Sequence, residues 1–135
     1  MKWLKALLGI IALMAVVYFV GPHPEKPVFD YTIHDIADGT NLDSLVNANE
    51  SKHHIKPNNE AKIIWEDSNH QQTDYAIVYL HGFSASQMEG DPVHRNIAKQ
   101  FHCNLYLARL AEHGIDTTDD LQNLTAEKYW ESAKE

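Results

Sequence analysis

The chain has 135 residues, a single cysteine and a formal net charge of -8 at pH 7. This acidic balance argues against nucleic-acid binding, because phosphate backbones are bound mainly by clustered Lys and Arg. One cysteine, Cys103, excludes an intramolecular disulfide, and the apolar Leu105 and Leu107 nearby predict a buried thiol. The sequence predicts neither a cofactor nor a metal, since His53 and His54 lack further ligands at suitable spacing.

The amino-terminal segment has the composition of a membrane-targeting helix. Residues 3–20 are apolar apart from Lys5, contain no acidic residue and follow Lys2. At about 1.5 Å per residue the segment spans about 25 Å, the short edge of a bilayer core. A signal peptide and an uncleaved anchor both fit, and the flanking Trp3 and Tyr18 with no A-x-A cleavage site favour the anchor. The basic residues predict an extracytoplasmic domain, periplasmic or extracellular, which is secreted if the segment is cleaved.

Three units are predicted along the chain: residues 1–21 as signal peptide or anchor, 22–60 as a linker and irregular lead-in, and 61–135 as the folded part. Three prolines among polar residues predict an extended linker at 21–27. A short strand is one interpretation of residues 28–36. Apolar residues at helical spacing after possible caps then predict a short helix. The caps are Thr40 and Asn41, and the apolar residues are Leu42, Leu45 and Val46.

The folded part begins with two expected strands. Residues 61–66 form the first, and the polar residues 67–74 are interpreted as a turn that leads into a neighbouring strand at 76–80. The second run is continuously apolar, without the alternation of a half-exposed strand, so it is expected to be covered on both faces.

A strand, helix and strand are expected next, which indicates a right-handed parallel crossover and an α/β fold. Asp91 and Pro92 are typical of a helix start, and Val93, Ile97 and Phe101 share the face expected to pack on the sheet. Residues 103–107 form the following strand. Thr125 is expected to cap a last helix, which carries Ala126, Tyr129, Trp130 and Ala133 on one face.

The stretch Y-L-H-G-F-S-A-S, the helix after it and N-L-Y-L-A-R-L-A-E-H-G together resemble the start of α/β-hydrolase fold enzymes, particularly the carboxylesterase and lysophospholipase-like branch. The resemblance implies that residues 61–135 are the amino-terminal part of such a domain. It also implies that His81 and Gly82 form the oxyanion loop and that the Phe83 N–H is an oxyanion-hole donor. Gly82 suits a sharp turn because it lacks a Cβ, and a fixed N–H aimed at developing charge lowers a barrier by about 3 kcal/mol.

The same resemblance implies further roles. Arg109, His113 and Gly114 would line a pocket for a small ester or acyl substrate. The nucleophile, the acid and the catalytic His are expected beyond Glu135, so the chain alone is expected to be inactive. The function expected is therefore the amino-terminal part of an exported or membrane-anchored serine hydrolase.

Three alternatives stay open. Residues 82–86 nearly match the nucleophile elbow G-x-S-x-G, with Ser86 in place of the last glycine, which would make Ser84 the nucleophile. Ser84 and Ser86 otherwise stabilise the loop. The chain is also interpretable as a non-catalytic membrane-anchored binding module, or as a truncated inactive hydrolase.

Overall fold

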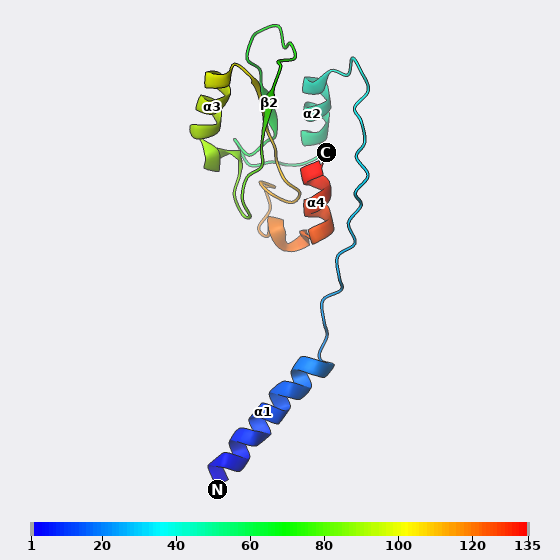
Figure 1. Ribbon diagram of the computed structural model, residues 1–135, viewed down its shortest axis with the longest axis vertical. Coiled ribbons are helices and arrows are strands. Elements are labelled where there is room, and N and C mark those ends of the chain that lie inside the picture. Colours follow the sequence, from blue (N-terminus) through cyan, green and yellow to red (C-terminus); the bar gives the residue numbers. More distant parts are fainter. Residues whose placement is uncertain (1, 135) are drawn as a thin grey trace.

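The computed structural model describes residues 2–134, which form a long helix joined by an extended segment to a small mixed α/β domain (Figure 1). The helix, α1 (Lys2–Val20), has no buried residue. It is long and apolar enough to cross a membrane, with a mean hydropathy of 2.2, although a signal sequence near the amino terminus has the same properties. The apolar helix expected from the sequence is therefore confirmed.

Three short strands form a mixed sheet in the order β1-β3-β2. They are β1 (Lys62–Ile64), β2 (Ala76–Tyr79) and β3 (Asn104–Leu107), and β3 is antiparallel to β1 and parallel to β2. The α/β class and the parallel crossover are thus confirmed. The expected pairing of β1 with β2 is wrong, because β3 lies between them.

The buried side chain of Asn104 explains this strand order. Its Oδ1 accepts the Glu66 N–H at 2.9 Å, its Nδ2 donates to the Gln71 carbonyl at 2.9 Å, and its own N–H donates to Thr73 Oγ1 at 3.0 Å. The segment between β1 and β2 is thereby held across the start of β3. The two strands lie on opposite sides of β3 as a result.

Strand β2 lies at the edge of the sheet and is not covered on both faces, which corrects the expectation for this run. Val78 keeps 59% of its surface exposed. Ile77 and Tyr79 are the β2 residues that pack against the core. That core is formed by Ala98, Cys103, Leu105 and Leu107, so the buried thiol is confirmed.

Helix α3 (Val93–Phe101) covers one face of the sheet, but it buries a neighbouring face of the helix and not the face that was expected. His94 and Ala98 are buried, whereas Val93 and Phe101 stay 62% and 67% exposed. The His94 ring packs edge-on against Tyr79 with centroids 4.7 Å apart. A small alanine and a ring that bonds the Gln87 carbonyl fit closely against the strands, which leaves the larger apolar residues outside.

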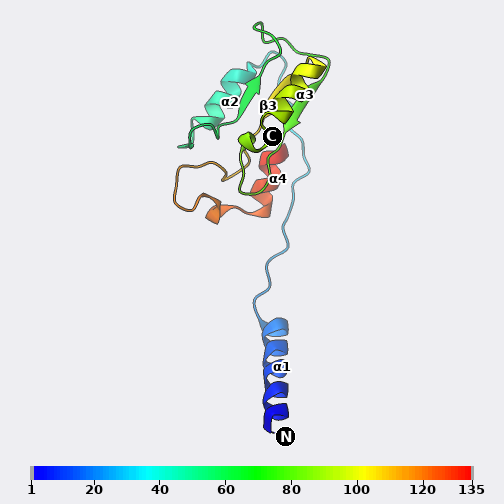
Figure 2. The ribbon, with the colours of Figure 1, turned by 90° about the vertical axis from the view of Figure 1, so that its left-hand side faces the viewer.

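Helix α2 (Leu42–Glu50) lies on the other side of the sheet from α3, and α4 (Ala126–Lys134) lies below α2, toward the end of the domain nearer α1 (Figures 1 and 2). Helix α2 is capped by Asn41, whose side chain accepts the Ser44 N–H, and α4 follows Thr125, whose Oγ1 accepts the Lys128 N–H. Both caps are confirmed. Two short 3-10 helices, η1 (Gln87–Gly90) and η2 (Asp120–Asn123), complete the domain. Residues 22–41 contain no helix or strand, so the strand considered for 28–36 is not formed.

Candidate functional site

The loops that follow β2 and β3 meet at one end of the sheet, because neighbouring parallel strands end at the same edge. The first loop carries His81 and the second carries His113, and both side chains are buried. Their ring centroids lie 4.8 Å apart. The structure therefore brings together the two histidines that the sequence placed at separate turns.

Each ring accepts a backbone N–H from the other loop. Leu110 N–H donates to His81 Nε2 at 3.2 Å, and Ser84 N–H donates to His113 Nε2 at 3.1 Å. A ring nitrogen that accepts carries no proton, so the proton of each neutral ring is on Nδ1. The two Nδ1–H groups donate to the carbonyls of Gly82 and Ala111, at 3.0 and 2.7 Å.

The environment of His81 favours this neutral form. Burial lowers the pKa of His81 below its usual 6.5, and His113 and Arg109 act in the same direction. The Gly82 carbonyl and Glu89 oppose the shift without reversing it. His81 is therefore an uncharged ring that ties two loops together at neutral pH.

Among residues 82–85 of the first loop, three backbone N–H groups have an acceptor and one does not. Gly82 N–H donates to Glu89 Oε2 at 2.8 Å, Ser84 N–H donates to His113, and Ala85 N–H donates to the Gly82 carbonyl at 3.1 Å. Within residues 2–134 the N–H of Phe83 has no acceptor. The Phe83 side chain is 73% exposed, so this donor belongs to an open part of the loop.

A small hollow of about 320 Å³ lies beside this loop. Its lining includes Ser84, Ser86, His113 and Gly114, so the hollow brings together four residues that the sequence singled out. Ser84 has a φ of +61°. Its N–H donates to His113 Nε2, the only unprotonated nitrogen of that ring. Ser84 Oγ forms no hydrogen bond with a possible general base among the described residues, and its role as nucleophile stays a prediction.

Arg109 is held by α2 and by the loop after β3, where its Nη1 donates to the His113 carbonyl at 3.4 Å. Its guanidinium forms a bidentate pair with Glu50 of α2, with Nε to Oε2 at 2.9 Å and Nη2 to Oε1 at 3.0 Å. Both side chains are nearly buried, at 8% and 13% exposure. A contact between Arg109 and a substrate stays a prediction, and the structure gives this residue a role in joining α2 to the strand end.

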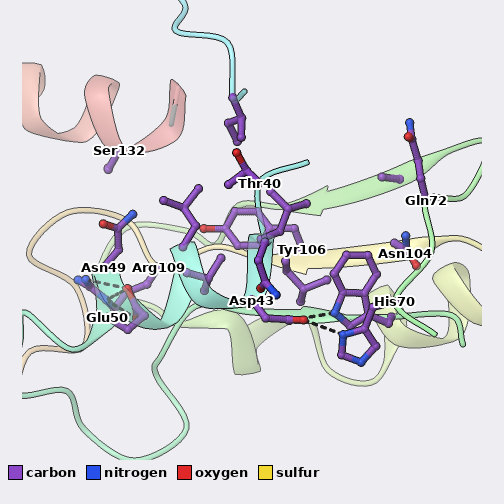
Figure 3. Close-up of a pocket in the computed structure, with 18 of the residues that line it drawn as sticks. Thr40, Asp43, Asn49, Glu50, His70, Gln72, Asn104, Tyr106, Arg109 and Ser132 are labelled. Carbon is purple, nitrogen blue, oxygen red and sulfur yellow. Dashed lines mark hydrogen bonds and ion pairs between the residues drawn. The ribbon is translucent and has the colours of Figure 1, made fainter. Parts of the chain in front are cut away.

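A larger cleft of about 1000 Å³, which Arg109 also lines, lies between α2 and the sheet (Figure 3). Asp43 accepts hydrogen bonds from Trp65 Nε1 at 2.9 Å and pairs with His70 Nδ1 at 2.6 Å. These two neighbours lower the pKa of Asp43. The Trp65 and His70 rings stack with centroids 5.0 Å apart, so the cleft has an aromatic wall at one end. Its apolar lining includes Leu45, Val46, Ile63 and Tyr106.

Sequence reasoning missed this cleft and two residues of the loop site. Glu89 is the acceptor for Gly82 N–H, and the fully buried Gln87 donates from Nε2 to the Asn58 carbonyl at 3.0 Å. The only signal for Glu89 was an acidic residue in the first turn of a short helix after the loop. Asp43, Trp65 and His70 gave no signal, because they are distant in sequence and meet only through the fold.

The comparisons with known proteins identify no relative. No protein-family model matches the chain, and no curated protein or solved structure is significantly similar to it. In the part of the chain that the structure describes, no three His, Cys, Asp or Glu side chains gather as metal ligands would.

Proposed function

We propose that residues 81–84 supply one half of an oxyanion hole in an exported or membrane-anchored serine hydrolase that acts on ester or acyl substrates. The observation that carries the proposal is the Phe83 N–H. It is the one N–H from residues 82–85 without an acceptor in the described structure. It also follows the strand end at which ligands bind in parallel sheets.

The proposed chemistry needs a donor that is fixed before the reaction. Attack by a serine on an ester carbonyl places negative charge on its oxygen, and a preorganised N–H stabilises that charge by about 3 kcal/mol. Here the Gly82 carbonyl, which shares a peptide unit with the Phe83 N–H, accepts from the Ala85 N–H and from His81 Nδ1. The N–H groups of Gly82 and Ser84, on either side, are held by Glu89 and His113. The donor is thus positioned without being used.

The proposal assigns the remaining parts of the site to sequence beyond Glu135. In the α/β-hydrolase fold, the second donor of the oxyanion hole is the N–H of the residue after the nucleophile. The motif G-x-S-x-G does not occur in the 135 residues. The mixed sheet with a free edge at β2 is compatible with the start of an α/β-hydrolase sheet, since this edge is open to a further strand.

The test uses the polypeptide purified from its native membranes with an antibody to the folded domain. The proposal predicts labelling by a fluorophosphonate at a serine outside residues 1–135. Phe83→Pro deletes the N–H and is expected to lower kcat for an ester about 10²- to 10³-fold. The matched control Phe83→Ala keeps the N–H and is expected to retain most activity. Absence of labelling, or equal losses in both variants, overturns the proposal.

A second candidate function, a membrane-anchored binding module, is favoured by the cleft of Figure 3. Its volume of about 1000 Å³ suits a small ligand, and its floor is apolar. Nile red is expected to bind the native chain with increased fluorescence, and Leu45→Glu in the cleft should abolish this binding. Val93→Glu, at an exposed apolar position outside the cleft, is the control. Equal binding by both variants contradicts a ligand site in the cleft.

A further inference from the structure

A short part of the linker, residues 28–31, packs against the outer side of α4, and we name it the strap. Val28 N–H donates to Glu127 Oε1 at 3.2 Å. The Asp30 carbonyl accepts from Trp130 Nε1 at 2.6 Å and from Lys134 Nζ at 3.1 Å. The linker is therefore attached to the domain well before α2 begins.

Aromatic side chains reinforce this attachment. The Trp130 ring contacts those of Phe29 and Tyr31, with centroid distances of 5.8 and 5.3 Å, and the latter two rings lie 6.4 Å from each other. The Lys134 side chain is only 8% exposed beneath the strap. Three hydrogen bonds and a cluster of three rings are more than a freely moving linker makes.

The strap shortens the free tether between α1 and the domain to residues 21–27. Eight Cα steps separate Val20 from Val28, and at no more than about 3.6 Å each they reach about 29 Å. Without the strap, the tether would extend to Asn41, the cap of α2, over 21 steps and about 75 Å. Docking of the strap thus limits how far the domain moves from the end of α1.

The strap also determines which end of the domain is near α1. In both views the loops after β2 and β3, together with the orange segment 115–125, lie at the end of the domain nearest α1 (Figures 1 and 2). The segment 66–75, between β1 and β2, lies at the far end. With α1 in a bilayer, the loop end therefore faces the lipid surface.

We propose that the strap is an orienting device, which holds the loop end of the domain against the bilayer that contains α1. The partner is an electrically neutral, zwitterionic lipid surface. Phe83 and Met88 present exposed apolar surface there, at 73% and 47%. Residues 81–90 and 115–125 contain no Lys or Arg, and Asp116 and Asp119 are exposed. Two lysines reach this end from other segments, Lys56 on Asp120 and Lys128 on the Asn123 carbonyl. Because acidic side chains outnumber these lysines, an anionic surface is disfavoured at this end.

The experiment measures energy transfer from a labelled residue to acceptor lipids, with the full chain in phosphatidylcholine vesicles. A Cys103→Ala background carries a single label at Thr118→Cys, in the loop end, or at Ser68→Cys, in the far end. Transfer is expected to be higher from position 118 than from position 68. The strap variant Phe29→Ala/Tyr31→Ala should abolish this difference, and it removes no residue of the folded core.

Two comparisons control the result. Tyr75→Ala removes an equally exposed ring at the far end and should leave the difference intact, whereas Trp130→Ala should abolish it as the strap variant does. Phosphatidylserine vesicles at low salt should reduce transfer from position 118. Equal transfer from both positions in the unaltered chain, a difference that survives loss of the strap rings, or a chain that is cleaved after α1 overturns the proposal.

Discussion

His81 and His113 each accept the backbone N–H of the loop that carries the other, with their ring centroids 4.8 Å apart. This reciprocal arrangement joins the ends of two parallel strands through two hydrogen bonds between the loops, and each ring also donates to a carbonyl of its own loop. It explains why the turn after β2 is ordered although Phe83 at its tip is exposed. The contact between the loops therefore depends on the Nε2 atom of each ring acting as an acceptor.

His113→Ala is expected to destabilise the domain by about 3 kcal/mol, because it removes a buried ring and leaves the Ser84 N–H without its acceptor. Urea unfolding of the full chain in micelles measures the change. The control is His102→Ala, since the His102 side chain is 80% exposed and pairs with Glu66 at the surface. The control should change stability by less than about 0.5 kcal/mol. Equal effects would show that the His113 tie is not important for folding.

Stability is expected to fall as the pH drops below 6.5. The pKa of His81 is lowered on folding, so the unfolded chain binds the proton more readily and gains population as the pH falls through 6.5. The carboxyl groups with lowered pKa, such as Asp43 and Asp120, reduce the stability only when the pH falls below their usual pKa of 3.8. Urea midpoints at pH 7.5 and 5.5 measure the loss. His81→Gln should flatten this dependence, and an unchanged slope in that variant would contradict the assignment.

The secondary structure was largely predictable, but its assembly was not. Caps at Asn41 and Thr125 are local signals, and both helices begin where those residues indicate. For α3 the spacing of Val93, Ile97 and Phe101 indicated a buried stripe, whereas the space beside the strands admits His94 and Ala98 instead. Periodicity records which residues share a face, and only the shape of the partner surface decides which face is buried.

The position of the candidate site at the end of a strand was predictable from the sequence. The contacts that other segments make with this loop were not. The His-Gly pair at residues 81–82 follows a strand, which identified the loop. The position of Glu89 relative to Gly82, and the contact of His113 with Ser84, depend on how β2 and β3 pair. The order of strands likewise depends on the buried Asn104, whose three contacts are all distant in sequence.

Arg109→Ala is expected to destabilise the domain by about 3 to 5 kcal/mol, because Glu50 is left as a nearly buried, unpaired charge. Arg95→Ala is the matched control. The Arg95 pair with Asp91 is half-exposed, at 35% and 34%, and should contribute about 0.5 kcal/mol or less. Thermal unfolding of both variants gives the comparison. If Arg109→Ala changed the thermal stability only slightly, the structural role would be contradicted and a contact with substrate would be the better interpretation of Arg109.

Gly114→Ala is expected to lower the free energy of unfolding by about 2 kcal/mol or more. A loss of this size would show that Gly114 is needed for the fold of the loop, beyond any role in lining a pocket. Gly114 has a φ of +67°, and an added Cβ would lie 2.6 Å from the Cβ of Asn59. Gly39→Ala is the control, because its φ of +78° imposes the same strain with no atom within 4 Å of the added Cβ. The difference in unfolding free energy between the variants measures the clash. No difference would mean that Asn59 moves aside freely.

The central claim is that the Phe83 N–H is a positioned and unoccupied donor for an oxyanion. The most direct measurement is a titration of the ¹⁵N-labelled chain in micelles with methylphosphonate, followed through the backbone amide resonances of residues 82–85. The account predicts a saturable downfield shift of the Phe83 amide proton, while the amides of Gly82 and Ser84 change little because Glu89 and His113 hold them. A Phe83 amide that does not respond, or one that shifts no more than its neighbours, would contradict it.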